Sequence, residues 1–559
     1  MNNLKTHLYN TFITGWRGWF WLVVIGLILY SPTLLFSYHY LDDNDLIMNN
    51  MDKLSQWSYL GQAWQEGVFH SPWGTELYYR PLLTISFMWD AHMPGNSLFF
   101  FHLTNIILHL LATLLFYLIL KKIWRKDWLN WLAALLFLIH PINLQAIAWL
   151  PGRNDSLLAV FVLAAFYAWL CWCANKKIGW LILYFIGFAL ALLTKESAIF
   201  LPMLSLLYLY IIKKEKIFAL PVWQLSIPTI IIAGVWWWLR INILPDSTLA
   251  NYTISQSLIR NLPGLIPSLG KIFIPVNLST FPILADMPMI YGFIAMIILI
   301  IIFSSLRGEK MRWAIFGFTW FLLFLIPSFL RPLNAQIDFA EHRNYLPLLG
   351  MIIILLQYRP HWINSKTSKL IAGGTATVIL IIFTGINFVH ARVYKDNISF
   401  WTNAVETSPT SAFNRNNLGA MYYISGKLDD AAQQWRAAIQ LNPREPLVQN
   451  NLGLIAAAQG NYEQAEKHYL KELTLHPDYT NALFNLGITY LHQNKPTEAA
   501  EYWEKTLAID PAYWSAYQNL IILYTEQKDN KQAKYWLTAW QQAGGKPPDA
   551  TIKMINQNK

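Results

Sequence analysis

The chain has 559 residues, of which 55% are hydrophobic, 15% aromatic and only 13% charged. Soluble domains carry roughly a quarter of charged residues, so this composition excludes an ordinary soluble enzyme and indicates a membrane protein. The formal net charge of +10 does not indicate nucleic-acid binding, because basic residues of multi-span proteins collect in cytoplasmic loops. Both cysteines, Cys171 and Cys173, lie in an apolar run, which excludes a disulfide framework and a cysteine-based metal site.

Apolar runs of about 20 residues, enough to cross a bilayer, recur up to residue 388. Eleven of spanning or near-spanning length are predicted to be spans: 16–37, 98–120, 128–149, 156–174, 178–194, 196–212, 223–242, 288–305, 313–330, 345–358 and 369–388. A further stretch, 262–280, contains three prolines, two glycines and Lys271, which predicts a re-entrant or interfacial segment. Residues 1–388 are therefore expected to form a helical, multi-span membrane domain.

Charge sets the expected orientation of these spans. With a cytoplasmic N-terminus, every inside segment is basic, as the positive-inside rule requires. The inside segments contain Lys5 and Arg17, KKIWRK (121–126), Lys176 and Lys177, KKEK (213–216), RGEKMR (307–312) and the residues from Arg359 to Lys369. The other polar residues at span ends then collect outside: Asp42, Asp43, Arg80, His140, Arg153, Asp155, Lys195, Glu196, Arg331, Glu341 and Arg343. Ionisable groups at span ends are costly to bury and often functional, although salt-bridged loop packing explains many of them equally well.

The polar region after the last span repeats with a period of 34 residues, which is the tetratricopeptide period. The repeating positions are Leu418, Leu452, Leu486 and Leu520; Gly419, Gly453 and Gly487; Ala431, Ala465, Ala499 and Ala533; and Pro409, Pro443, Pro477 and Pro511. Four repeats are predicted over 409–544, followed by a tail over 545–559. Trp401 and Ala404 fall 34 residues before Trp435 and Ala438, so residues 389–408 are predicted to be a connecting half-repeat. Such solenoids usually bind peptide or protein segments, and the alternative is a spacer.

The acidic pair Asp42–Asp43 directly follows the first span on the outer face. A transferase that uses a lipid-linked donor needs a carboxylate there to accept the proton of an incoming hydroxyl. Its donor carries a phosphate leaving group at the bilayer surface, which Arg or Lys side chains can neutralise. The alternative for the aspartates is capping of a short helix, and Asp45 is the more natural cap.

A succession of short blocks resembles the transmembrane and tetratricopeptide-repeat-containing O-mannosyltransferases and their bacterial relatives, which are C-type glycosyltransferases. The blocks are LDDNDLIMNN, YYRPLLTISFMWD, FFFHLTNIILH, HPINLQAIAWLPGRNDSL, LLTKESAIFLP, FAEHRNYLPLLG and ARVYKDNISFWTNAVETSP followed by NNLG. The resemblance covers nearly the whole chain in the same order. It implies inverting transfer of a sugar, mannose in the studied relatives, from a polyprenyl phosphate to a protein hydroxyl. It also matches Asp42 and Asp43 to the acidic pair in which the family's catalytic base is proposed to lie.

We therefore predict an all-α, C-type glycosyltransferase-like membrane domain followed by a tetratricopeptide solenoid that binds the protein acceptor. The predicted catalytic residues are Asp42 and Asp43. The predicted phosphate-binding residues are Lys195, Arg343, Arg331 and Arg153, and the supporting residues are Arg80, His140, Asp155, Glu196, Glu341 and His102. No His or carboxylate spacing requires a metal, so none is predicted, and the only cosubstrate expected is the lipid-linked sugar.

Two other functions remain open from the sequence. One is a membrane-anchored repeat scaffold that assembles envelope proteins without chemistry, and the other is a ligase or transporter of lipid-linked glycans. The expected partners are the bilayer, the polyprenyl-linked sugar and a protein acceptor, without nucleic acid. The expected location is a bacterial inner membrane with periplasmic repeats, or the endoplasmic reticulum membrane with lumenal repeats in a eukaryote.

Overall fold

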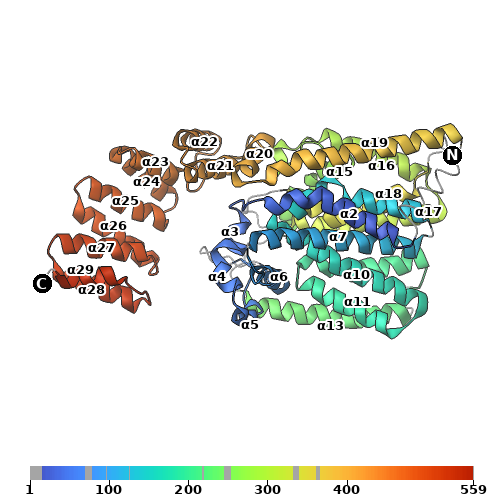
Figure 1. The fold of residues 1–559 in the computed structure, drawn as a ribbon, viewed down its shortest axis with the longest axis horizontal. Helices are drawn as coiled ribbons and strands as arrows, with labels where there is room; N and C mark the ends of the chain where they lie inside the picture. The colour runs from blue at the N-terminus through green and yellow to red at the C-terminus, as the bar shows by residue number, and fades with distance from the viewer. Residues whose placement is uncertain are drawn as a thin grey trace. The chain divides into compact units, whose positions relative to one another are not determined.

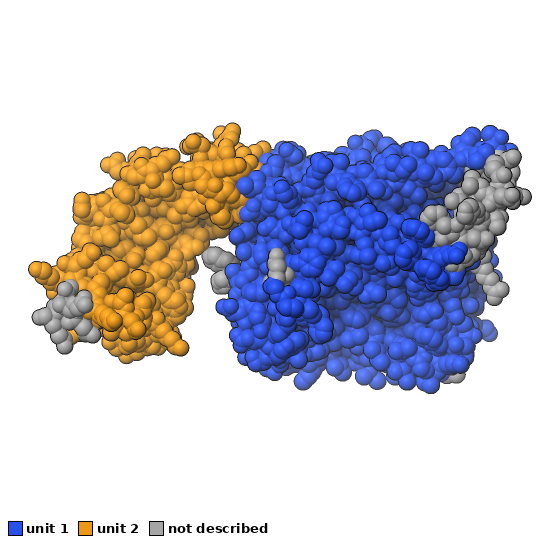
Figure 2. All heavy atoms as spheres, in the orientation of Figure 1, with its two compact units in different colours: residues 1–409 blue, residues 410–559 orange. Residues whose placement is uncertain are grey.

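The computed structural model describes residues 15–69, 78–95, 97–124, 126–216, 220–244, 254–330, 339–359 and 365–557, and every regular element in these ranges is a helix. The chain divides into two compact units, residues 1–409 and 410–559 (Figure 2). The predicted all-α class, with apolar helices followed by repeats, is confirmed.

The first unit is built from long apolar helices (Figure 1). They are α2 (Arg17–Tyr30), α7 (Ser97–Ile123), α8 (Asp127–Leu138), α10 (Arg153–Asn175), α11 (Ile178–Leu192), α12 (Leu201–Leu207) with η7 (Tyr208–Lys213), α13 (Leu220–Ile243), α16 (Ile290–Ser305), α17 (Gly308–Leu325), α18 (Tyr345–Gln357) and α19 (Lys366–Ala391). Within the described ranges, seven helical segments are long and apolar enough to cross a membrane, or up to eight if a bent pair counts as one. Each of the eleven predicted runs coincides with one of these elements, and the number that crosses the bilayer stays a prediction.

The predicted span over 128–149 is a bent pair. The helix α8 and the following segment Pro141–Ala148 meet at an angle of 47°. Pro141 lacks a backbone N–H, and His140 before it is extended, as residues before proline usually are. The bend therefore has a local cause, and the residues that follow it, 141–148, are buried.

Close helix packing in the first unit depends on small residues. Gly317 of α17 and Gly350 of α18 face each other, and a Cβ atom at Gly317 would lie 2.5 Å from the carbonyl oxygen of Gly350. Small residues allow helix backbones in membranes to approach until van der Waals contact stabilises them. The pair α17–α18 is thus fixed by two positions where any side chain would meet backbone.

Short elements connect the long helices, and those labelled α3 to α6 gather at one end of them in Figure 1. They are η1 (Ser31–Leu35), α3 (Asp42–Leu46), η2 (Met48–Asn50), α4 (Met51–Leu54), η3 (Trp57–Tyr59), α5 (Leu60–Ala63), α6 (Pro81–Ala91), η4 (Pro141–Asn143), α9 (Leu144–Ala148), η5 (Leu150–Gly152), η6 (Glu196–Phe200), α14 (Ile254–Asn261), η9 (Leu262–Gly264), α15 (Leu265–Phe273), η10 (Leu284–Asp286), η11 (Ile326–Phe329), η12 (Glu341–Asn344), η13 (Arg392–Tyr394) and α20 (Asn397–Thr407). The segment 262–280, predicted to be re-entrant or interfacial, contains the short helices η9 and α15. The predicted half-repeat, residues 389–408, lies within the first unit.

The second unit consists of four antiparallel helix pairs and a final helix. They are α21 (Ala412–Ile424) with α22 (Leu428–Leu441), α23 (Val448–Ala458) with α24 (Tyr462–Leu475), α25 (Thr480–His492) with α26 (Pro496–Ile509), α27 (Trp514–Glu526) with α28 (Asn530–Gln542), and α29 (Asp549–Gln557). The repeated glycine contacts an aromatic ring of the same pair: Gly419 with Trp435, Gly453 with Tyr469, and Gly487 with Trp503. The 34-residue period of the sequence therefore reflects the same contact between a glycine and an aromatic ring in successive helix pairs.

Replacing Gly350 tests the α17–α18 contact. Gly350→Ala would place a methyl group against the backbone of Gly317, and we expect it to lower the free energy of unfolding by about 1–3 kcal/mol. The measurement is unfolding of the detergent-solubilised protein followed by circular dichroism. The matched control is Gly373→Ala in α19, where a Cβ atom meets nothing within 4 Å. Equal stability of the two variants would contradict the close packing.

Candidate functional site

The two predicted catalytic aspartates lie in the first turn of α3, but their surroundings differ. Asp42 is half-buried and Asp43 is fully buried. The Asp43 Oδ2 accepts hydrogen bonds from the backbone N–H of His39, at 3.2 Å, and from the indole N–H of Trp149, at 3.3 Å. The Asp43 Oδ1 is buried without a hydrogen-bonding partner among the described residues. An unpartnered buried oxygen is costly, which marks Asp43 as more than a helix-starting residue.

Helix capping does not account for these aspartates. The residue at the N-cap of α3 is Leu41, without a side-chain capping bond. Asp45, which was expected to be a cap, lies inside α3 instead. The negative charges still suit the first turn of a helix because its free N–H groups carry partial positive charge. Within the acidic segment, residues 42–45, Asp43 is held by the His39 N–H and by the Trp149 indole.

Aromatic and histidine rings surround Asp43. The His39 Nδ1 lies 3.7 Å from the Asp43 Oδ2, and His102 of α7 lies close enough to His39 to interact with it electrostatically. His102 is fully buried, with its ring edge-on to that of Phe36. Burial, together with the nearby Asp43 charge, raises the pKa of Tyr38 to about 12. The predicted supporting residue His102 thus belongs to the surroundings of Asp43.

A charged network joins four predicted residues from three distant segments. Lys195 donates to both carboxylate oxygens of Asp155 at 2.8 Å, and Arg80 donates to both oxygens of Glu196 at 2.8–3.2 Å. His342 adds a fifth member, because its Nε2 lies 3.8 Å from the Asp155 Oδ2. Burial lowers the pKa of the Lys195 ammonium, and the adjacent Asp155 carboxylate opposes that shift. We call these five residues the charged network.

The charged network reaches Asp43 through one aromatic residue. The ring of Trp149 packs against the ring of His342 with centroids 5.4 Å apart, and its indole N–H bonds to Asp43. Gln145 holds His342 from the other side, through its Oε1 at 3.0 Å from the His342 backbone nitrogen. The acidic segment and the charged network are therefore parts of one contiguous polar region.

A second ion-paired cluster adjoins this region. Glu341 precedes His342 in η12, and its Oε1 accepts bonds from the Lys271 ammonium at 2.8 Å and from the Ser279 backbone N–H at 2.6 Å. His390 lies 4.0 Å from the Glu341 Oε2. The interrupted segment 262–280 therefore supplies a buried lysine that neutralises a predicted site residue.

Two predicted residues occupy interior structural positions. Arg153 is fully buried and donates to the Asn105 side chain at 2.7 Å and to the carbonyl oxygens of Ser86 and Phe101, besides its ion pair with Asp90. The expectation that Arg153 binds a phosphate conflicts with this position, because protein acceptors surround its guanidinium. The His140 Nε2 bonds to the Ile272 carbonyl at 2.9 Å, so this residue holds α15 in place.

The remaining phosphate-binding candidates are placed differently. Arg343 follows His342 in η12 and is half-buried. Arg331 lies outside the described residues. Among the described residues, no group of three His, Cys, Asp or Glu side chains is placed to hold a metal ion.

Sequence reasoning missed several contributors to this region. Trp149 lies in HPINLQAIAWLPGRNDSL and His342 in FAEHRNYLPLLG, but nothing in their spacing shows that they join Asp43 to Asp155. Asp90 and Lys271 carried a visible signal, because each is a lone charge in an apolar stretch and such charges need a buried partner.

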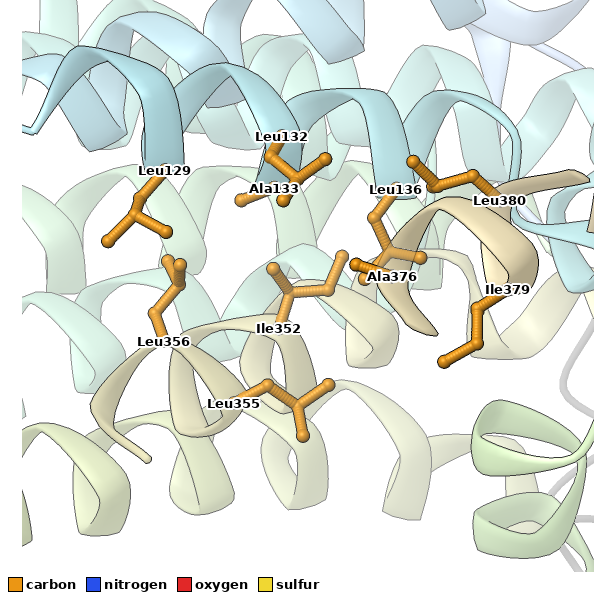
Figure 3. A pocket seen from close by; sticks show the side chains of 10 residues that line it. All are labelled: Leu129, Leu132, Ala133, Leu136, Ile352, Leu355, Leu356, Ala376, Ile379 and Leu380. Atoms are coloured by element: carbon orange, nitrogen blue, oxygen red, sulfur yellow. The ribbon is translucent and has the colours of Figure 1, made fainter. Parts of the chain in front are cut away.

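An apolar pocket of about 190 Å³ lies elsewhere in the first unit (Figure 3). Its lining is entirely aliphatic and comes from α8, α18 and α19: Leu129, Leu132, Ala133, Leu136, Ile352, Leu355, Leu356, Ala376, Ile379 and Leu380. The part of α18 that lines the pocket is its C-terminal half, away from η12, and the lining side chains offer no polar group that could orient a substrate. The polar region is therefore the better candidate for chemistry.

Breaking the Arg153–Asp90 pair tests the structural role of Arg153. Arg153→Met would leave Asp90 buried without its partner, and loss of one member of a buried pair costs about 3–5 kcal/mol. Unfolding in detergent measures this loss. The control is the double variant with Asp90→Asn, which should recover part of it because no carboxylate is left unpaired. A stable single variant would show that Arg153 is not required by the fold.

Comparisons with known proteins agree with this organisation. The family model "Dolichyl-phosphate-mannose-protein mannosyltransferase" matches residues 69–244, which include most of the charged network, and two tetratricopeptide repeat models match residues 419–460 and 444–512. Protein O-mannosyl-transferase TMTC2 of Mus musculus is 30% identical over 197 residues, which are 33% of this chain and 23% of the relative. Protein O-mannosyl-transferase TMTC1 of Mus musculus is 34% identical over 134 residues, which are 23% of this chain and 14% of the relative.

Among solved structures, the crystal structure of MamA is 20% identical, covers 26% of this chain and 86% of that chain, and has a TM-score of 0.25.

The match to the two curated relatives covers less than a quarter of the length of each of them. The chain combines a mannosyltransferase-family segment with tetratricopeptide repeats, and its relatives are protein O-mannosyl-transferases, so the resemblance to the transmembrane and tetratricopeptide-repeat O-mannosyltransferases is confirmed.

Proposed function

We propose that this protein is a membrane glycosyltransferase that moves a sugar, mannose or another hexose, from a polyprenyl phosphate to a protein hydroxyl. The observation that carries the proposal is Asp43, a buried carboxylate with one unpartnered oxygen beside the charged network. The similarity to protein O-mannosyl-transferases supports the reaction class.

The proposed reaction is a single inverting displacement. The acceptor oxygen attacks the anomeric carbon of the sugar while the bond from that carbon to the phosphate oxygen breaks. The hydroxyl proton passes to a carboxylate of the Asp42–Asp43 pair, and the electron pair leaves with the polyprenyl phosphate. A positioned base of this kind contributes roughly 10²–10⁴-fold to a rate.

The leaving phosphate needs positive charge, and the charged network offers it at its edge. The side chains of Lys195 and Glu196 are 17% and 27% exposed, so an anion has access to this edge. Lys195 and Arg343 are the proposed phosphate-binding residues among the described ones, and Arg331 extends this set by sequence. Arg153 is not included, because protein groups surround its guanidinium.

The non-cytoplasmic face is proposed from charge. The basic residues Lys121, Lys122, Lys176 and Lys213 lie at the ends of α7, α10 and η7 away from the acidic segment, and basic ends mark the cytoplasmic side. An outer-face site must take its sugar from a lipid carrier, which agrees with the phosphate-binding residues.

The repeats are proposed to bind the protein acceptor. Asparagine side chains join successive repeats, since Asn451 donates to Asn416 at 3.1 Å and Asn485 donates to Asn450 at 3.0 Å. Arrays of this kind present extended concave surfaces that suit polypeptide segments.

Replacing each aspartate of the pair tests the proposed base. We expect Asp43→Asn or Asp42→Asn to lower sugar transfer by at least about 100-fold, because the base is lost while the shape is kept. The assay follows transfer of labelled mannose from polyprenyl phosphate to Ser/Thr peptides by the purified protein. The matched control is Asp45→Asn, the same change inside the same helix, which should leave the rate unchanged. Full activity of both pair variants would remove these residues from catalysis.

Replacing the phosphate-binding candidates tests the donor site. We expect Lys195→Met and Arg343→Gln to raise the KM for the lipid-linked donor by about tenfold or more, since each removes one charge-assisted hydrogen bond to phosphate. The control is Lys121→Met in the last turn of α7, at the end of this helix away from the charged network, and it should leave the donor KM unchanged. Unchanged donor KM in both test variants would contradict the assignment.

A further inference from the structure

The large aromatic residue of the repeats makes the same hydrogen bond in two of them. The indole N–H of Trp435 donates to the carbonyl oxygen of Asn416 at 3.0 Å, and that of Trp503 donates to Phe484 at 3.2 Å. In both cases the acceptor lies 19 residues earlier, in the first helix of the same repeat. The bond therefore ties the two helices of one repeat together.

Trp401 of α20 has the same phase but a different acceptor. It precedes Trp435 by 34 residues, yet its indole N–H donates to the carbonyl oxygen of His39 at 3.0 Å, across 362 residues of sequence. Two more bonds hold residues 37–39 to η13 and its C-cap: the Ser37 N–H donates to the Lys395 carbonyl at 3.0 Å, and the His39 Nε2 lies 2.9 Å from the Tyr394 carbonyl. His39 therefore supplies the acceptor that the first helix supplies in these two repeats.

His39 transmits this contact to Asp43. Its carbonyl accepts the bond from Trp401, its own N–H donates to the Asp43 Oδ2, and its ring packs on that of Phe400 with centroids 4.9 Å apart. A continuous line of hydrogen bonds thus runs from α20 to the buried carboxylate and on to Trp149.

The backbone beside His39 is strained, so it needs such support. Tyr40 has a φ of +55°, in the left-handed region that bulky residues rarely adopt. Strained residues persist only where their surroundings hold them, and they gather at functional sites. The following helix α3 has five residues, too few to hold its own position. The bond from Trp401 fixes the carbonyl that directly precedes Tyr40.

The helix α20 also holds the loop around Thr280, and this loop contacts Gln145 beside the charged network. The Thr280 Oγ1 donates to the Phe400 carbonyl at 2.8 Å, and the Asn403 Oδ1 accepts from the Thr280 N–H at 3.0 Å. The Thr280 carbonyl accepts from Gln145, which holds His342. Through α20, both parts of the polar region are attached to one element.

We propose that Trp401 is a positioning residue for the proposed transfer reaction. The helix α20 continues the repeat pattern in sequence, but in this proposal it serves the function of the membrane unit. The Trp401 N–H holds residues 37–40 so that the Asp43 Oδ2 keeps its two donors and Oδ1 stays without a hydrogen-bonding partner among the described residues. This role rests on the proposed function, because positioning has meaning only for a catalytic Asp43.

The test compares Trp401→Phe with Trp435→Phe in the full-length protein. Each variant removes one indole N–H that donates to a buried carbonyl and keeps an aromatic ring. We expect Trp401→Phe to lower kcat for sugar transfer by about tenfold with the donor KM unchanged, and Trp435→Phe to change neither. Amide hydrogen exchange read by mass spectrometry should accelerate in residues 37–47 only in Trp401→Phe.

The two readouts separate the possible failures. Equal exchange in residues 37–47 of both variants would overturn the bracing, and faster exchange with unchanged kcat would overturn the positioning role. A wild-type protein without sugar transfer to any acceptor would overturn the proposed function and the catalytic part of this proposal. Faster exchange in Trp401→Phe would then still support α20 as the partner of residues 37–39.

Discussion

Removing charge from water inside a membrane protein is expensive, and the pairing that this cost enforces shapes one end of the first unit. Four ion pairs there join segments that lie far apart in sequence, so matched charges hold together parts of the chain that no short loop connects. The pairs are Arg80 with Glu196, Lys195 with Asp155, Arg153 with Asp90, and Lys271 with Glu341. The apolar helices can pack by shape alone, whereas the polar end is fixed by matched charges. The proposed site lies where this matching leaves an edge of the network partly exposed.

The two units use different sources of stability. In the bilayer there is little hydrophobic drive between helices, so close approach at Gly317 and Gly350 supplies van der Waals contact. In the repeats, burial of aromatic rings such as Trp435 and Trp503 against glycines removes apolar area from water. Small residues appear in both units, but they admit a helix backbone in one and a ring in the other.

The sequence predicted well whatever depends on local periodicity. The 34-residue period located every helix pair of the repeats, and hydropathy located each long helix of the first unit. It also selected Arg80, Asp155, Lys195 and Glu196, which the structure brings into one network. It could not separate Lys195 at the edge from Arg153 in the interior, because both read as basic residues at a span end. That distinction depends on Asp90 and Asn105, whose positions follow from tertiary packing.

The long-range contact of the half-repeat could not be predicted from the sequence either. The phase of Trp401 predicted half a repeat, but nothing in the sequence indicated that residues 37–39 supply the missing partner across 362 residues. Trp149 posed the same difficulty, since its indole N–H could serve any acceptor. Such pairings are decided by where the bend at Pro141 and the turn at Tyr40 direct the chain, and these directions depend on the assembled helices.

The length of α18 has a consequence for how this helix fits the bilayer. Its 13 residues rise only about 20 Å, less than the roughly 30 Å hydrocarbon core, and nearly every side chain from Tyr345 to Ile354 is covered by protein. Because protein surrounds most of these side chains, α18 does not have to match the hydrocarbon thickness by its own length. Its contacts with α17 and α8 set its depth instead.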